Sequence, residues 1–341
     1  MSPHLVCGRG CLMFLKLSNF FQRSGAPQRC PGTTIFPGVD NGRRLLSAVV
    51  LAMLLALSST GCSLIIRKAG EALVSGNSIY ATDDDPDLVW EALPFGLKTI
   101  EGLLVEAPKS KKLLLAAASG FTTYAYGHLQ QDADFIEGDD LAAATALRAR
   151  ARKMYRRALD YGLRGIEVDF PDFRNELDKD PQAAVSKLQK KHVPLMYWTA
   201  IAWGAAISIS KDDPGLSADQ HLVEALMRRA LALDETWERG SIHDFFISYE
   251  GGRASIGGSL AKAREHFERA RQLCQAFRVA PLVSYAETVS VLTQNKKEFQ
   301  SLLEEALAFD ANKAPETRMA NLIIQKRAKW LMGRTEELFV D

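Results

Sequence analysis

The sequence predicts an all-α protein, built as an array of antiparallel helical hairpins, and three observations lead to that prediction. Apolar residues recur with a helical period almost throughout from Leu88 onward, and few windows alternate with period two. Breakers such as Ala107-Pro108 and Ala280-Pro281 divide this region into segments that suit pairs of helices. One apolar template also recurs in several segments, which is typical of a repeat protein. We therefore expect residues 83–341 to form one helical-repeat domain.

The segment ahead of this domain has the layout of a secretory signal peptide. Two arginines precede an apolar run at Leu45–Leu57, and small residues then lead to Cys62. The run is shorter than the roughly 17–25 residues of a membrane-spanning helix. A cysteine in this place resembles a bacterial lipobox, although Ser59 stands where a leucine is usual. We expect residues 43–61 to be a lipoprotein signal peptide, Cys62 to carry the lipid, and residues 62–82 to be an anchor and lead-in.

Ser63 follows the lipidated position, where an aspartate is the typical signal for retention in the inner membrane. We therefore expect the periplasmic side of the outer membrane, with the inner membrane less favoured. Residues 1–42 fit this leader poorly, because a signal peptide begins within a few residues of its arginines. Two interpretations stay open for them: translation begins later, at Val39 read from an alternative start codon, or the chain carries a disordered extension.

Composition excludes some function classes. The chain holds 42 basic and 41 acidic residues, and six of the basic ones but only one acid lie before Cys62, which leaves residues 62–341 with a net charge of −4. That balance argues against nucleic acid as a partner, because nucleic-acid binding needs a basic face.

If Cys62 is lipidated, Cys274 has no disulfide partner in this part of the chain, and we expect it to be a buried thiol.

The repeated template is an apolar residue, a second apolar or aromatic residue four positions later, and an alanine three positions after that. This spacing places all three side chains on one face of a helix, where the alanine allows a neighbouring helix to approach closely. It matches the second helix of the tetratricopeptide repeat, a helical hairpin of about 34 residues, and we expect a solenoid of that type. The template occurs four times: Ala151-Tyr155-Ala158, Val223-Met227-Ala230, Ala263-Phe267-Ala270 and Phe299-Leu303-Ala306.

The first helices of the hairpins are rich in aromatic residues among Ala, Ser, Thr and Glu. In a helical solenoid these helices line the concave surface, where ligands or peptides bind. The alternative for each residue is an ordinary place in the core. We predict that a ligand or partner groove, one shared cavity or concave surface, includes residues from this set: Tyr124, Tyr126, Trp198, Trp203, His243 and Tyr285.

Motifs for catalysis and for cofactors are missing from the sequence. His243-Asp244 lacks a second metal ligand at the expected spacing, since Ile247 stands there. No glycine-rich phosphate loop and no nucleophile elbow occurs. A pair formed by Glu250 and Glu287 is the remaining catalytic alternative, but such carboxylates are far more often solvated or capping. We predict no enzyme activity, no catalytic residue, no metal site and no cofactor.

Several longer segments resemble the T-component family of TRAP transporters (tripartite ATP-independent periplasmic transporters), which are lipoproteins with tetratricopeptide-like repeats. The resemblance covers nearly all of residues 63–341 and implies an all-helical, tunnel-bearing protomer that can form a homotrimer. It also implies a periplasmic solute-binding protein as partner and a small hydrophobic or organic-acid ligand. The segments that carry it are Asp83–Leu104, Leu113–Gly127, Val193–Pro214, Ala263–Ala270 and Asn321–Phe339.

Two functions follow as hypotheses. The first is a periplasm-facing lipoprotein that docks a solute-binding protein and helps to deliver its ligand. The alternative is a helical-repeat lipoprotein that scaffolds assembly of the cell envelope and binds no small molecule. A neighbouring gene for a solute-binding protein would favour the first.

Overall fold

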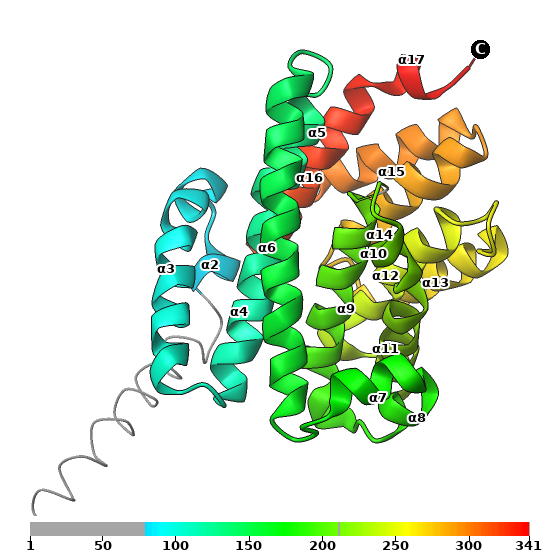
Figure 1. Ribbon diagram of the computed structural model, residues 1–341. Helices are drawn as coiled ribbons and strands as arrows, with labels where there is room; N and C mark the ends of the chain where they lie inside the picture. Colours follow the sequence, from blue (N-terminus) through cyan, green and yellow to red (C-terminus); the bar gives the residue numbers. More distant parts are fainter. Residues whose placement is uncertain (1–78, 211, 341) are drawn as a thin grey trace, which may run out of the picture. The chain divides into compact units, whose positions relative to one another are not determined.

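The computed structural model describes residues 79–210 and 212–340, which form helices joined by short turns, with no β-strand among them. The all-α prediction is therefore confirmed for this part of the chain (Figure 1). The signal peptide, Cys62 and the extension at residues 1–42 lie outside the described residues. In chain order the elements are α2 (Ile79–Thr82), α3 (Pro86–Glu106), α4 (Lys111–Tyr124), η1 (Ala125–Gln130), α5 (Gln131–Ile136), α6 (Leu141–Glu167), α7 (Phe173–Lys179), α8 (Pro181–Ser186), η2 (Lys190–His192), α9 (Val193–Ser208), α10 (Pro214–Ala218), α11 (Gln220–Leu233), η3 (Trp237–Arg239), α12 (Ser241–Gly251), α13 (Leu260–Cys274), α14 (Ala280–Tyr285), η4 (Ala286–Ser290), α15 (Lys296–Ala308), η5 (Ala311–Lys313), η6 (Pro315–Thr317), α16 (Arg318–Gly333) and α17 (Thr335–Leu338).

Short polar side chains begin the long helices. The Asp85 carboxylate accepts hydrogen bonds from the backbone N–H groups of Asp87 and Leu88, each at 3.1 Å, and Pro86 opens α3 with a fixed helical φ. Ser259 and Asn295 cap α13 and α15 in the same way. These caps satisfy backbone donors that a helix leaves unpaired at its first turn.

The apolar template marks the buried face of its four helices, as its spacing predicts. All twelve template residues are buried, and they lie in α6, α11, α13 and α15. Cys274 at the end of α13 is also a buried free thiol, which confirms that prediction. The buried residues gather in three apolar clusters, one mainly from α9, α11 and α12, one from α3, α4 and α6, and one from α13 to α16.

Two glycines let α6 and α9 pack closely. A Cβ built on Gly162 would lie 2.2 Å from the Thr199 hydroxyl oxygen, and one built on Gly165 would lie 2.5 Å from a Leu195 methyl carbon. A Cβ at Gly162 would also lie 3.2 Å from the Thr199 Cα, so the backbones themselves would have to move, whereas at Gly165 the Leu195 side chain would have to give way. Gly162 therefore permits the close approach of α6 and α9.

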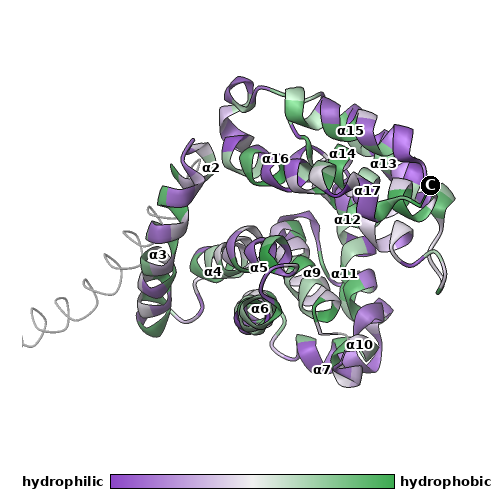
Figure 2. Cartoon of the chain, turned by 90° about the horizontal axis from the view of Figure 1, so that it is seen from above, coloured by the Kyte–Doolittle hydropathy of each residue, from purple (hydrophilic) through white to green (hydrophobic). Residues whose placement is uncertain are grey.

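The last long helix packs against the first described helices. α16 contacts α2 and α3, and η6 contacts α2, as the view from above shows for α16 and α2 (Figure 2). The Arg318 guanidinium donates to the Thr82 carbonyl oxygen at 3.2 Å across this junction. The first and the last long helices of the described residues are thus in contact.

A lipid bilayer could not be spanned by any helix of the described residues, because none combines the necessary length with an apolar sequence.

Candidate functional site

A buried arginine, Arg327 on α16, forms the centre of a charged network between the helices. Its Nε lies 2.8 Å from the Glu287 carboxylate, to which an Nη group also donates, and its other Nη lies 3.0 Å from Asp134. The opposite oxygen of Asp134 accepts from Arg148 at 2.8 Å, and Arg148 also binds Glu137 at 2.6 Å. The network therefore links α16 to η4, α5 and α6.

Two π-helices meet this network, and they are the two in the described residues. η1 carries Tyr126 and leads directly into the α5 turn that holds Asp134, while η4 carries Glu287. A π-turn shifts the register of the following side chains, and such turns occur frequently at functional sites. Burial raises the pKa of Tyr126, with Glu287 and Asp134 adding to the rise and Arg327 opposing it. The phenol therefore stays neutral and can donate or accept a hydrogen bond.

Gln131 places a buried amide beside the network. Its side chain is fully buried, and its amide interacts with the Tyr126 hydroxyl, whose pKa this contact lowers slightly against the effect of burial. Its neighbour Gln130 accepts from the Tyr155 hydroxyl at 2.7 Å. An amide carries one oxygen acceptor and two N–H donors, so Gln131 keeps hydrogen-bonding capacity beyond its contact with Tyr126.

The charges limit what the network can bind. Arg148 and Arg327 face the carboxylates of Asp134, Glu137 and Glu287, and both arginines have carboxylate partners. Arg334 acts on Glu137 as well, so the charges around the network balance. Because both central arginines already bind carboxylates, a neutral polar group fits this place better than a further anion.

The six residues of the predicted groove lie in different surroundings. Tyr126 borders the Arg327 network, Tyr124 lies 5.3 Å from His128 between ring centres, and the Trp198 ring lies 5.3 Å from Tyr197. No ring contact or hydrogen bond within the described residues joins any two of the six. Three of them belong to three separate apolar clusters: Trp203, Tyr124 and Tyr285. That some of the six share one binding surface remains a prediction.

His243, another of the six, belongs to a histidine pair. Its Nδ1 lies 2.8 Å from Nδ1 of His266, and its Nε2 lies 3.3 Å from Glu235, which Arg269 binds with two nitrogens at 2.7 Å. Burial lowers the pKa of His243 and lowers that of His266 to about 4, with the charge on His243 adding to the second shift. Both rings are therefore neutral at pH 7. The described residues contain no group of three His, Cys, Asp or Glu placed to hold a metal ion.

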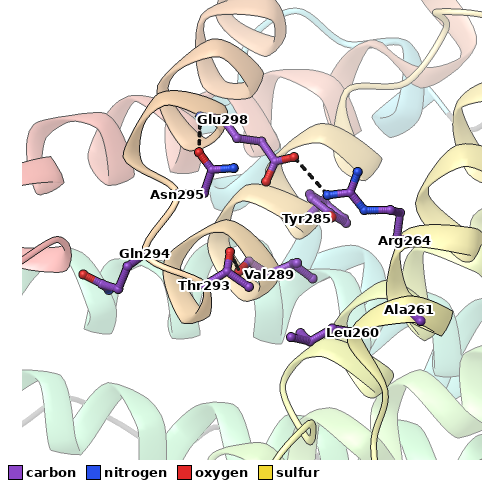
Figure 3. A pocket seen from close by; sticks show the side chains of 9 residues that line it. All are labelled: Leu260, Ala261, Arg264, Tyr285, Val289, Thr293, Gln294, Asn295 and Glu298. Atoms are coloured by element: carbon purple, nitrogen blue, oxygen red, sulfur yellow. Dashed lines mark hydrogen bonds and ion pairs between the residues drawn. The ribbon is translucent and has the colours of Figure 1, made fainter.

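A pocket of about 650 Å³ opens between α13, the α14–η4 helix and the start of α15 (Figure 3). Tyr285, the sixth predicted residue, lines it, and its phenol stacks on Phe267 with 4.3 Å between ring centres. η4 therefore contributes to the network and to the pocket: Glu287 pairs with Arg327, and Val289 lines the pocket. The lining residues are Leu260, Ala261, Arg264, Tyr285, Val289, Thr293, Gln294, Asn295 and Glu298.

The central residues of the network were missed from the sequence, although a signal exists. Arg327 lies four residues after Ile323 and four before Leu331, both buried, so it occupies a core position of an amphipathic helix. A charge at such a position has to be paired inside the protein. Its partners could not be found in the same way, because they lie on other helices.

The described residues define an all-α protein with a buried arginine paired to carboxylates on an early and a late helix, and with a pocket between α13, η4 and α15. A family model described as TRAP transporter T-component matches residues 82–339, and the chain belongs to this family. The resemblance seen in the sequence is therefore confirmed. An uncharacterized protein of Treponema pallidum (strain Nichols) is 27% identical over 268 residues, which cover 77% of this chain and 83% of that protein.

Proposed function

We propose that this protein is the accessory component of a TRAP-type transporter, where it docks a periplasmic solute-binding protein and helps to deliver a small organic or hydrophobic ligand. The observation that carries the proposal is the family match, because it spans nearly the whole described array rather than one hairpin. The network around Arg327 supports it, since Tyr126 and Gln131 place a neutral hydroxyl and a buried amide between the helices. Neither a catalytic role nor a cofactor is part of the proposal.

Membrane attachment through Cys62 belongs to the same proposal. A lipid on Cys62 would hold the helical array on the periplasmic side of the outer membrane, within reach of a periplasmic partner. Replacement of Cys62 by Ser should move the protein from the membrane pellet into the soluble periplasmic fraction. If the variant stays in the pellet, the lipobox interpretation is wrong.

The docking step is tested with the solute-binding protein encoded beside this gene. The two purified proteins should form a complex in light scattering and calorimetry, and native mass spectrometry should reveal a co-purified small molecule. The same measurements give the oligomeric state, for which the family suggests a homotrimer. Absence of both complex and ligand would favour the envelope scaffold instead.

A tetratricopeptide-type arrangement of the hairpins completes the proposal. It is supported by the burial of all four copies of the template, each closing with a fully buried alanine on a second helix. An experimental structure with the partner bound would test this arrangement, since a solenoid should present its first helices to that partner.

A further inference from the structure

The outer face of α3, the first long helix, is apolar but exposed. Phe95 is 80% exposed, Val105 77% and Leu88 56%. These three share one side of the helix with Ala92 and Gly102, because all five recur at helical spacing. A Cβ built on Gly102 would have nothing within 4 Å, and α3 lies at the edge of the array (Figure 2). An exposed apolar stripe of this kind is typical of a surface that another element covers.

The chain enters the described residues beside this outer face. Ile79 is the first residue of α2, and the next residue, Tyr80, reaches α3. A Cβ built on Gly96 would lie 2.9 Å from the Tyr80 hydroxyl oxygen. Since Gly96 follows Phe95 directly, the residues that precede Ile79 are within reach of the outer face.

Residues 63–78, which lie outside the described residues, have a sequence that fits the outer face. At helical spacing, one stripe of this segment is apolar or small, and the opposite side is charged. Leu64 falls on the charged side. The stripe consists of Ile65, Ile66, Ala69, Ala72, Leu73 and Gly76, and the charged side carries Arg67, Lys68 and Glu71. Such a mixture of large and small residues can pack around Phe95 and fill the space over Gly102.

Charge favours this segment over two other occupants. Glu91 and Glu106 are exposed carboxylates on the outer face, while Lys98 is already paired with Glu101. The segment has two basic residues and one acid, so its charge complements the outer face. A second copy of α3 would bring the same carboxylates, and the negative surface of a phospholipid bilayer would repel them.

We propose that residues 63–78 dock on the outer face of α3 as an amphipathic helix, with Ile66 and Leu73 among the residues that cover Phe95. The docking itself needs neither a lipid nor a partner protein. One consequence rests on the proposed lipid attachment at Cys62: a docked helix of this length holds the array within about 24 Å of the bilayer. The same residues as an extended tether would allow about 55 Å. The docked segment therefore limits how a periplasmic partner can approach.

Photocrosslinking in cells identifies the occupant. Benzoylphenylalanine in place of Phe95 reacts with whatever lies on the outer face, and mass spectrometry locates the product. We expect a crosslink within one chain to a peptide from residues 63–78. A crosslinked dimer would assign the outer face to a second copy, and a lipid adduct would assign it to the bilayer. Either result, or no product, would overturn the proposal. Ile256, 71% exposed between α12 and α13, is the control position, and benzoylphenylalanine there should not react with this segment.

Variants in the segment test its orientation. Ile66→Ser and Leu73→Ser should each lower the yield of the crosslink at least about threefold, because each places a hydroxyl in an apolar contact. Leu64→Ser is the matched control: Leu64 lies on the charged side of the segment, and the yield should stay unchanged. An equal loss in all three variants would contradict docking through the apolar stripe.

Hydrogen exchange checks the same contact with the natural residues. Backbone amides of residues 63–78 should exchange more slowly in the protein than in a synthetic peptide of the same sequence. Phe95→Ser should raise their exchange rate at least about tenfold, whereas Ile256→Ser should leave it unchanged. Exchange at the rate of the free peptide in the unmodified protein would overturn the proposal. Neither measurement involves a solute-binding protein, so a negative result leaves the proposed function as it stands.

Discussion

Arg327 and Glu287, 40 positions apart in the sequence, form an ion pair with two hydrogen bonds that joins α16 to the π-helix η4. The same guanidinium binds Asp134, which lies 193 positions away on α5. Burial opposes the charged form of Arg327, but hydrogen bonding to Glu287 and the surrounding carboxylates raise its pKa overall. One side chain therefore connects the early and the late helices of the array.

Replacement of Arg327 by Met should destabilise the fold by about 3–5 kcal/mol, because it leaves Glu287 and Asp134 without their common cation. Arg334→Met, at the end of the same helix, is the control, since Arg334 pairs with Glu337 on the surface and its loss should change stability by less than about 1 kcal/mol. Urea denaturation measures both. Adding Glu287→Gln to Arg327→Met should restore part of the stability, and equal effects of the two single variants would contradict a central role for the network.

Gly162→Ala should destabilise the protein by about 1–3 kcal/mol, because the new methyl group would lie 2.2 Å from the Thr199 hydroxyl oxygen between α6 and α9. Gly102→Ala is the matched control on α3. A Cβ at this position would have nothing within 4 Å, so the exchange should stabilise the helix by about 0.5–1 kcal/mol. Thermal denaturation should move the two melting temperatures in opposite directions, and a shift in the same direction would contradict the close packing of α6 and α9.

Acid should destabilise the protein through His266, whose pKa is lowered to about 4 by burial first and then by the charges of His243, Arg228 and Lys262. Between about pH 6.5 and 4 the unfolded chain binds more protons at this residue than the folded one. The contribution of His266 to the free energy of unfolding is therefore complete above about pH 6.5. It is lost as the pH falls, by at most about 1.4 kcal/mol per pH unit.

His266→Asn keeps a polar atom near the position of Nδ1 and removes the titration. Denaturant unfolding of this variant should depend less on pH between 7 and 5 than that of the unmodified protein. Glu235 stays ionised in the folded protein between pH 7 and 5, because hydrogen bonds from Arg269 lower its pKa to about 2. The exposed His221 provides the control, and an equal effect of His221→Asn on the pH dependence would contradict the assignment to His266.

Alanine variants of Tyr126 and Trp203 should show whether these two predicted aromatic residues line a groove or belong to the core. Trp203 is 6% exposed in an apolar cluster, and its Nε1 donates to Asp219 at 3.2 Å, so Trp203→Ala should cost about 3–5 kcal/mol. Tyr126 is only half-buried, and Tyr126→Ala should cost clearly less stability while weakening the binding of ligand or partner. Melting temperature and affinity are measured for both. Normal binding by the folded fraction of Tyr126→Ala would assign this residue to the core as well.

The sequence by itself determined the helices, their buried faces and the family. These properties depend on local spacing: the template at Ala151, Tyr155 and Ala158 occupies one helix face whatever helix packs against it, and all three side chains are buried. Family membership is recognised from the order of such segments along the chain.

The tertiary structure alone decided which residues meet. Arg327 could be recognised as a charge at a core position, but its partners depend on how α16 packs and on the two π-turns, which change the register of Tyr126 and Glu287. Tyr285 was predicted as a groove residue from its place on a first helix, yet only the packing shows that its side chain is buried and stacks on Phe267 at the border of a pocket. Helical periodicity describes one helix at a time, whereas a site is formed by side chains from several.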